Sequence, residues 1–423
     1  MMLEMQKKFT NTFYSILSLP STGMGFALSI QIAALSWLMR TRYNLDLHEI
    51  GFVWAAGPLA GIIGQPIVGL ISDKVWFWGG RRRPFILLGG ILAGLMLFAL
   101  PNIDRISGLL GLSSIIIVAV IVALSLDVAI NISFNPTRSI IADITDEGVS
   151  RTKGYTWMQT ISGSFGVLAY ALGAIFGNYF LIYFGVFLVL LFSIVPMFFI
   201  TEPKELKGSQ SDETHEDFKT DWNQYLKLLF AHSFSWIGVQ TMFVYMIGFV
   251  EQKLNPSNPN ETGQILSISF LILNAVGALL PAFVLEPMTE KIGRVKTHIS
   301  CLAIMAFAYF GIVIAGKSSI IVWSLMAVAG IGWAAIVSLP FAIMSEKVNR
   351  NKMGLFMGIF NLSVVIPQLV VSLVLGYIIQ NAEDKNLIFL ISSVALAISA
   401  LLWFTVRESK KVKESLKTNL SGH

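Results

Sequence analysis

The stretch Ser114–Thr137 reads SIIIVAVIVALSLDVAINISFNPT, and it is long and apolar enough to cross a lipid bilayer. Its one charged residue is Asp127, and the next charge along the chain is Arg138. An ionised acid at membrane depth costs about 3 kcal/mol or more, so such a group faces a water-filled cavity, pairs with a base or takes up a proton. Asp127 is therefore the first candidate for a functional site.

The composition of the chain is that of a membrane protein. Of its 423 residues, 55% are hydrophobic and only 13% are charged, whereas a soluble domain carries about a quarter charged residues. The excess apolar surface has to face lipid, and about a dozen spans would leave no room for a soluble domain. The net charge of +5 is explained by basic cytoplasmic loops, so nucleic acid is not expected as a partner.

No metal, cofactor or enzyme active site is expected from the sequence. The single cysteine, Cys301, excludes an internal disulfide and a cysteine-based metal cluster. The histidines, among them His232 and His298, show no metal-ligand spacing. The chain also lacks a phosphate-cradling loop, which argues against ATP as the driving force, and a nucleophile–base pairing that would indicate a hydrolase.

The chain divides into twelve apolar segments, which we expect to be helices because lipid-exposed backbone must satisfy its own hydrogen bonds. A polar linker, 201–223, separates an N-terminal half, 1–200, from a C-terminal half, 224–423. This layout is typical of the major facilitator fold, an all-α membrane fold of twelve helices in two pseudo-symmetric halves. An arbitrary helical bundle is the alternative. The segments are 20–39, 50–71, 84–101, 114–137, 155–177, 179–200, 226–250, 264–285, 297–316, 319–344, 353–380 and 386–406.

The basic residues set the expected orientation of the chain. If both termini and the linker lie in the cytoplasm, only six of the 30 Lys and Arg residues fall on the outer side. The positive-inside rule therefore predicts a multi-pass protein of the cell membrane with both termini cytoplasmic. The six outer residues are Arg40, Arg42, Arg105, Lys253, Lys317 and Lys385.

The loop after the second segment combines an acid, Asp73, with the arginine cluster Arg81, Arg82 and Arg83. An Asp beside an Arg can form a charge-assisted contact, and a pair that bridges two helices would hold the inner face closed as a gate. The alternative is that the arginines anchor the topology at the lipid headgroups. The two roles do not exclude each other.

Two further charges, Arg138 and Asp143, lie at the inner end of the fourth segment. We expect them to pair with each other or with the loop after the second segment, as part of the same conformational network. A fainter copy of that loop, Glu290–Lys296 (EKIGRVK), follows the eighth segment. Such a copy is what duplicated halves would leave behind.

Three strings carry a resemblance to a known family. They are Gly80–Ile86 (GRRRPFI), which follows Asp73 by seven residues, Leu126–Asn131 (LDVAIN) and Gly358–Gln368 (GIFNLSVVIPQ). Together they resemble the plant sucrose transporters, which with animal and bacterial relatives form a sugar:proton symporter branch of the major facilitator superfamily. The matches occur in both halves and in the same order, so the resemblance spans nearly the whole chain.

The resemblance implies uptake of a disaccharide or similar glycoside together with a proton. In that family the acid of the Leu-Asp-Val-Ala string is the proton-coupling group, and it falls on Asp127 here. The plant proteins carry acidic residues after a tyrosine near the end of the seventh helix, whereas this chain reads Tyr245-Met246-Ile247-Gly248. That departure leaves the identity of the sugar open.

Amide side chains inside the spans are candidates for contacts with sugar hydroxyls, because an amide both donates and accepts hydrogen bonds. Asn131 lies one turn after Asp127 on the same helix face. Pro367, beside Gln368, is expected to kink or unwind its helix and free carbonyl groups. Amides can also simply hold membrane helices together. The candidates for substrate binding are Gln31, Asn131, Gln240, Asn361 and Gln368, with Asn274 ranked below them.

The tryptophans of the spans divide into two groups. Trp54, Trp236 and Trp333 lie inside spans, where a ring can stack on a sugar but more often only packs against other helices. Trp37 and Trp403 lie near span ends and are expected to be anchors at the membrane interface.

The sequence thus predicts a proton-coupled secondary transporter that imports a sugar, a disaccharide such as maltose or sucrose, by alternating access as a monomer in a lipid bilayer. The alternatives are a carrier of another polar solute, a drug exporter, and a passive pore or membrane sensor. Accumulation of solute against a gradient would exclude both the passive pore and the membrane sensor.

Overall fold

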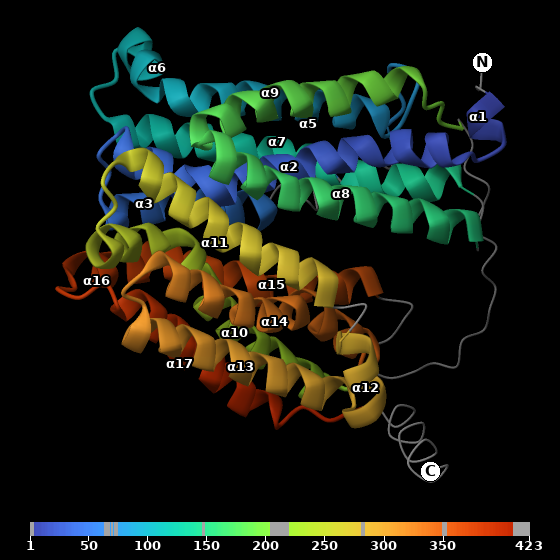
Figure 1. The fold of residues 1–423 in the computed structure, drawn as a ribbon. Coiled ribbons are helices and arrows are strands. Elements are labelled where there is room, and N and C mark those ends of the chain that lie inside the picture. The colour runs from blue at the N-terminus through green and yellow to red at the C-terminus, as the bar shows by residue number, and fades with distance from the viewer. Residues whose placement is uncertain are drawn as a thin grey trace. The chain divides into compact units, whose positions relative to one another are not determined.

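The computed structural model describes residues 4–62, 68, 71, 75–145, 149–203, 220–280, 284–348 and 353–408. Every named element in these residues is a helix (Figure 1). The chain forms two compact units. Unit 1 comprises Met1–Gln210 with Asn258–Ser267, and unit 2 comprises Ser211–Ser257 with Ile268–His423.

Unit 1 is built from long apolar helices that run side by side (Figure 1). Helix α2 packs along α8, α9 and α7, and α5 packs on α7 and α9. The helices are α1 (Glu4–Lys7), α2 (Asn11–Thr41), α3 (Leu47–Trp54), α5 (Arg83–Ala99), α6 (Ile103–Leu110), α7 (Ile115–Ile144), α8 (Val149–Phe176) and α9 (Asn178–Ile194), with the short 3₁₀ helices η1 (Leu100–Asn102) and η2 (Val195–Phe198).

Unit 2 has the same construction. Helix α10 packs on α17 and α15, and α13 packs on α14 and α17. The helices are α10 (Trp222–Phe249), α11 (Pro259–Leu280), α12 (Glu286–Ile292), α13 (Arg294–Ala315), α14 (Ser319–Ser345), α15 (Met353–Val370), α16 (Gly376–Asn381) and α17 (Leu387–Trp403), with the π-helical turns η3 (Val250–Leu254) and η6 (Val371–Leu375). The first turns of α11, through Ser267, belong to unit 1.

Ten helices of the described chain are long and apolar enough to cross a membrane, and α17 is a shorter apolar helix. They correspond to eleven of the twelve expected segments. The remaining segment, 50–71, is represented by α3 and by helical residues 56–62, and most of its second part lies outside the described residues. Most of the linker, 204–219, also lies outside them.

The first span begins earlier than the sequence indicates. Helix α2 starts at Asn11 rather than near residue 20, and the hydroxyl of Thr10 caps it by accepting a hydrogen bond from the Phe13 amide at 3.2 Å. Phe13 and Leu17 are buried in a cluster with Ile86 of α5 and Ile141 of α7. Tertiary packing therefore extends the helix into a region that is too polar to be recognised as a span.

Helix α15 does not unwind at Pro367: it continues to Val370, and the π turn η6 follows directly. The expectation that two tryptophans are interface anchors is wrong. Trp37 and Trp403, expected as interface anchors, are 2% and 0% exposed. The Trp37 indole donates to the Pro259 carbonyl at 2.6 Å, and the Trp403 ring packs on His298. Their neighbours in the fold, rather than headgroups, hold these rings.

Helices α5 and α7 approach each other closely at Gly89. A Cβ added at Gly89 would lie 2.7 Å from the carbonyl oxygen of Ala129, two residues after Asp127. Small residues allow such approaches between membrane helices, where dispersion contacts stabilise the packing. Gly89 therefore fixes the part of α7 that carries the candidate acid.

We predict that Gly89→Ala destabilises the protein by about 1–3 kcal/mol, because the added methyl group overpacks the contact with α7. The matched control is Gly61→Ala, since a Cβ at Gly61 meets no atom within 4 Å and alanine favours a helix over glycine. Thermal unfolding in detergent measures both. Equal melting temperatures for the two variants would contradict the close approach.

Candidate functional site

Asp127 is buried in the middle of unit 1. Its side chain is on α7, and the residue is 5% exposed. The carboxylate oxygen Oδ2 accepts a hydrogen bond from Nε2 of Gln31, on α2, at 2.9 Å. On another side it faces Gly57, where an added Cβ would lie 3.3 Å from Oδ2. The acid thus occupies a small space lined by α2, α7 and the helical segment 56–62.

The Asp127 carboxylate has no basic partner among the described residues. Its one described side-chain hydrogen bond comes from the neutral amide of Gln31. A single neutral donor offsets little of the cost of burying a full charge. An amide can, however, serve both forms of the acid, because its NH₂ donates to a carboxylate and its carbonyl accepts from a protonated carboxyl.

The face of α7 that carries Asp127 continues toward the inner end of the helix. Asn131, Phe134 and Arg138 follow Asp127 at intervals of three or four residues, which places them on one side of a helix. The Asn131 amide donates to the backbone carbonyl of Asp127 at 2.8 Å. The guanidinium of Arg138 lies over the Phe134 ring, 4.2 Å from its centroid.

At the end of unit 1 that holds the N-terminus, an ion pair joins α5 to α7. Nε of Arg82 lies 2.8 Å from Oδ2 of Asp143, and both side chains are largely buried, at 7% and 12% exposure. The sequence left open whether Asp143 pairs with Arg138 or with the arginine cluster. Among the described residues Arg138 makes no ion pair, and the arginine cluster provides the partner of Asp143. Asp73 lies outside the described residues.

The same ionic cluster contains a residue that the sequence had assigned to the linker, Glu202. Its carboxylate accepts hydrogen bonds from the backbone amides of Arg81, Arg82 and Arg83 at 2.7 to 2.9 Å. It therefore caps the first turn of α5, where helix amides have no partners of their own. The Arg83 guanidinium also donates to the Met197 carbonyl at 2.6 Å. The chain after α9 is thereby fixed to the start of α5.

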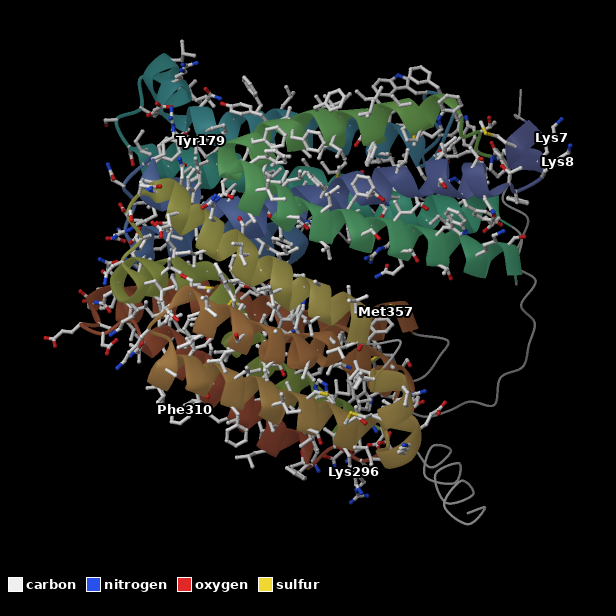
Figure 2. The ribbon with its side chains drawn as sticks, viewed as in Figure 1. Lys7, Lys8, Tyr179, Lys296, Phe310 and Met357 are labelled. Carbon is white, nitrogen blue, oxygen red and sulfur yellow. The ribbon has the colours of Figure 1, made fainter. Side chains whose placement is uncertain are left out.

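Other contacts place this cluster at the basic end of unit 1. The Gln6 amide donates to the carbonyl of Thr201, next to Glu202, at 2.7 Å. Lys7 and Lys8 follow Gln6 directly, and they lie at the end of the unit opposite to Tyr179 (Figure 2). An acid directly after the sixth apolar segment, on the same predicted side as the arginines, was the signal that could have revealed Glu202.

Unit 2 repeats this arrangement with different residues. Arg294, at the start of α13, forms an ion pair with Glu346, which follows α14. The carboxylate of Glu408, after α17, accepts from the backbone amide of Val295 at 2.9 Å. Burial raises the pKa of the Glu408 carboxyl, while the bond from Val295 works in the opposite direction. In both units an acid after the last helix caps the third span, and an Arg at that cap pairs with an acid at the end of the fourth.

The amides of unit 2 meet inside the helical bundle. Nε2 of Gln368, on α15, donates to Oε1 of Gln240, on α10, at 3.3 Å. Gln240 is buried and Gln368 is half-buried, and Asn361 lies half-buried seven residues earlier on α15, on the same helix face. This bond leaves the Gln368 carbonyl and the Gln240 NH₂ group as further hydrogen-bonding groups.

Aromatic rings lie near these amides. The rings of Trp236 and Trp333 meet edge to face at 6.2 Å, and Phe243 packs on Trp333 at 5.5 Å. The Trp333 indole donates to Oδ1 of Asn274 at 3.1 Å. Each indole donor has a protein partner, since Trp236 donates to His232 at 3.0 Å. Both tryptophans are half-buried, so part of each residue is accessible.

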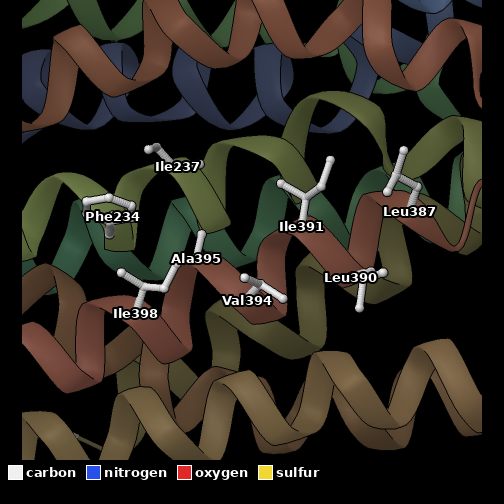
Figure 3. Close-up of a pocket in the computed structure, with 8 residues that line it drawn as sticks. All are labelled: Phe234, Ile237, Leu387, Leu390, Ile391, Val394, Ala395 and Ile398. Atoms are coloured by element: carbon white, nitrogen blue, oxygen red, sulfur yellow. The ribbon is translucent and has the colours of Figure 1, made fainter.

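A groove of unit 2 has a different character. It runs along α17 and α10, encloses about 330 Å³ and has only apolar side chains in its lining (Figure 3). It offers no hydrogen-bonding side chain to a polar solute and suits a lipid-facing surface. Its lining residues are Phe234, Ile237, Leu387, Leu390, Ile391, Val394, Ala395 and Ile398. In the described part of the chain, no group of three His, Cys, Asp or Glu side chains gathers to hold a metal ion.

A comparison with protein families matches residues 18–372 to the Major Facilitator Superfamily. The chain belongs to this superfamily. The inward-open xylose transporter XylE from E. coli superposes with a TM-score of 0.72 at 15% identity, over 96% of this chain and 99% of that one. A D-xylose-proton symporter gives 0.70 at 15% identity, over 95% and 99%. The predicted fold class, twelve helices in two halves, is confirmed.

Curated relatives of this facilitator chain align over most of its length. It is 25% identical to the sucrose transport protein SUC4 of Arabidopsis thaliana, over 90% of this chain and 86% of that protein. It is 27% identical to the sucrose transport protein SUT2 of Oryza sativa subsp. indica, over 83% of each. A general alpha-glucoside permease of Schizosaccharomyces pombe is 30% identical over 37% of this chain. The suspected membership in the sucrose transporter-like branch is thereby supported, and the chain is a multi-pass membrane transporter.

We predict that the Arg82–Asp143 pair contributes a coupling energy of about 1.5–3 kcal/mol, because both charges are largely removed from water. A double-mutant cycle with Arg82→Ala and Asp143→Ala, followed by thermal unfolding, measures it.

The control is the exposed pair of Arg42 and Asp104, which lie 3.1 Å apart at 33% and 47% exposure. Its coupling energy should stay below about 1 kcal/mol. A coupling energy for the Arg82 pair no larger than that of the exposed pair would contradict a stabilising role of the buried pair.

Proposed function

We propose that this facilitator imports a sugar together with a proton, and that Asp127 carries the proton. The observation that carries the proposal is a buried acid within a membrane span, hydrogen-bonded to the neutral amide of Gln31 and without a described basic partner. Such an acid is stable when protonated and costly when ionised, so its charge state can bias one conformation against another.

The transport cycle follows from the chemistry of this acid. A proton from the outside neutralises Asp127, and its carboxyl then donates to the Gln31 carbonyl, which a rotation of the amide brings into place. The neutral site accepts the sugar, and the loaded carrier exposes it to the inside. Loss of the proton to the more alkaline interior leaves a charge on Asp127, and this charge favours return of the empty carrier to its outward-facing state. The free energy of the proton gradient thereby moves the sugar.

A sugar is the solute that best fits the polar side chains inside the two units. Its hydroxyls both donate and accept, as the side chains of Gln31, Asn131, Gln240, Asn361 and Gln368 do. Half-buried indole rings such as those of Trp236 and Trp333 suit the apolar C–H faces of a sugar ring. The relatives named as sucrose transport proteins and as an alpha-glucoside permease support a disaccharide or glucoside.

The ionic clusters are proposed as braces of the inner end of each unit. Arg82, Asp143 and Glu202 fix α5, α7 and the chain after α9 as one body, and the backbone of Arg81 and Arg83 shares this cap. Arg138 and Asp73 remain proposed members of the network. Rigid ends let a unit move as a whole, which alternating access requires. We further propose that the protein works as a monomer in the cell membrane with both termini cytoplasmic.

A carrier of another polar solute, or a drug exporter, is the competing proposal, since a nucleoside transporter shares the fold with a TM-score of 0.69. Uptake of labelled maltose, sucrose, nucleosides and a lipophilic cation into cells without their own carriers separates these functions. Sugar accumulation that an uncoupler abolishes supports the proposal, and its absence for every sugar overturns it.

We predict that Asp127→Asn abolishes accumulation, lowering the ratio of inside to outside sugar to about 1, because the amide cannot carry a proton. Exchange of sugar across the membrane should persist when the pH is the same on both sides. Uptake by the wild type should rise as the outside pH falls, whereas uptake by the variant should not depend on pH.

Two further variants control for acid chemistry and for space. Asp104→Asn removes an exposed acid and should accumulate normally. Asp127→Glu keeps the acid but adds a methylene group where Gly57 leaves little room, so accumulation should fall without vanishing. Concentrative uptake by Asp127→Asn would overturn the assignment.

We predict that Gln368→Leu and Gln240→Leu each raise the KM for the sugar by about tenfold or more, because a buried hydrogen-bonding group is lost. Asn381→Leu, which removes an exposed amide bonded to the Tyr377 carbonyl, should leave KM unchanged. Initial rates of labelled uptake give the comparison, and an unaltered KM in both glutamine variants would exclude these amides from binding.

A further inference from the structure

A tight turn before α5 presents a tryptophan ring at the surface of unit 1. Phe77 and Gly80 form an isolated β-bridge, in which the Phe77 amide donates to the Gly80 carbonyl at 3.1 Å and the Gly80 amide donates to the Phe77 carbonyl at 3.2 Å. The two residues between them, Trp78 and Gly79, have positive φ angles of 51° and 75°. Two such angles in succession are typical of a type I′ hairpin turn. We name residues 75–80 the aromatic turn.

Trp78 is an unfavourable residue for its position in two respects. Asn, Asp and Gly adopt a positive φ in such a turn at low cost, whereas a bulky side chain is strained there. The residue is also 69% exposed, so its large ring lies outside the packed core of unit 1. Strained backbone that the surrounding structure holds in place is found mostly at functional sites. The Trp78 side chain is therefore a candidate for a contact outside the protein.

The aromatic turn is fixed to the start of α5. The Phe77 ring meets the ring of Phe85, on α5, edge to face at 5.8 Å, and it contacts the Trp78 ring at 5.4 Å. The guanidinium of Arg83 donates to the Gly79 carbonyl at 3.3 Å. Together with the β-bridge, these contacts present the Trp78 ring from a firm base.

The length of α5 places the aromatic turn at the level of a membrane surface. This helix has 17 residues and is about 26 Å long, close to the hydrocarbon thickness of a bilayer. Its exposed apolar side chains recur every three or four residues and mark the side of the helix that faces lipid. They are Leu88, Ile91, Leu95 and Phe98. Since the turn directly precedes α5, it lies at headgroup level, where tryptophan is enriched.

The charges beside the aromatic turn favour an anionic partner. The Arg82 guanidinium is paired with Asp143, and the Arg83 guanidinium binds backbone carbonyls. Among the described residues, the Arg81 side chain makes no ion pair, and Glu202 binds only its backbone amide. Three guanidinium groups thus lie near two carboxylates in the described part of this end of unit 1. The excess positive charge attracts anionic headgroups.

We infer that the aromatic turn binds the membrane surface on the proposed cytoplasmic side, with Trp78 among the lipid headgroups and Arg81 at the phosphate of an anionic phospholipid. The partner is a lipid surface rather than a soluble protein, because a lipid-facing span begins directly beside the turn. The contact holds the start of α5, and the acid cap at Glu202, at a constant depth in the bilayer. The inference goes beyond the proposed function, since it involves no transported solute and no proton.

Spin labels in reconstituted vesicles measure the depth of the turn. Cys301, which is fully buried, is replaced by alanine, and a nitroxide is attached at Val75→Cys, a position that is 37% exposed and leaves Trp78 intact. Leu95→Cys provides the lipid control, and Glu383→Cys, an exposed residue between α16 and α17, provides the water control. Oxygen concentrates in hydrocarbon and a polar nickel chelate stays in water, so the ratio of their collision rates with the nitroxide gives its depth.

In vesicles of phosphatidylcholine and phosphatidylglycerol, we expect the oxygen-to-nickel ratio at Val75→Cys to lie several-fold above that at Glu383→Cys and below that at Leu95→Cys. Adding Trp78→Asn, which suits a positive φ, should lower the ratio to that of the water control, whereas Trp78→Tyr should preserve it. A ratio at Val75→Cys equal to the water control in the wild-type turn would overturn the inference. A ratio that Trp78→Asn leaves unchanged would overturn the role of the ring.

The lipid composition tests the charge of the partner. Vesicles of phosphatidylcholine alone should lower the ratio at Val75→Cys several-fold, and high salt should have the same effect on the mixed vesicles. Arg81→Gln should remove this dependence on phosphatidylglycerol, and Lys317→Gln, at an exposed position between α13 and α14, should retain it. The same depth in both kinds of vesicle would overturn the recognition of anionic lipid.

Thermal unfolding in detergent separates membrane contact from folding. Because Trp78→Asn relieves the unfavourable φ, this variant should unfold at the same temperature as the wild type or at a higher one. Its loss of depth in vesicles would then reflect the lost lipid contact alone. A clearly lower unfolding temperature would contradict the inference, because Trp78 would then stabilise the fold itself.

Discussion

The free-energy cost of a charge in hydrocarbon is the constraint on which the rest of this protein depends. Asp127 lies in a space where Gly57 contributes no side chain and where Gln31 supplies an amide that can donate or accept a hydrogen bond. A lysine or arginine at that position would neutralise the acid permanently and fix one conformation. In the proposed cycle, a neutral amide leaves the charge state of the acid to the proton gradient, which is what a coupled carrier requires.

The same constraint explains where the other charges lie. The ion pairs of Arg82 with Asp143 and of Arg294 with Glu346 are at helix ends, and in each unit an acid after the last span caps the third. Carboxylates at helix N-termini satisfy free amides and interact favourably with the helix dipole. The two units therefore have the same ion pair and the same capping acid at corresponding helix ends, although the surrounding sequences, GRRRPFI and GRVK, have diverged.

The sequence predicted the fold class and the spans because apolar length is a local property of the chain. It also singled out Asp127, whose isolation can be read directly. It could not predict contacts that depend on helix packing, such as Gln31 with Asp127 or Gln240 with Gln368. The pairing of Asp143 follows from geometry: Arg138 precedes it by five residues, about 140° around the helix, whereas Arg82 approaches from α5. Glu202 was missed because a polar residue after a span looks like linker.

The central claim is that the Asp127 carboxyl is protonated within the membrane in one state of the carrier and ionised in another. Infrared difference spectroscopy of the purified protein in lipid measures this directly through the C=O stretch of a protonated carboxyl. The account predicts such a band at neutral pH in the sugar-bound wild type, lost when sugar is removed at alkaline pH and absent from Asp127→Asn. The absence of that band from the wild type, or its presence unchanged in the Asn variant, would contradict the claim.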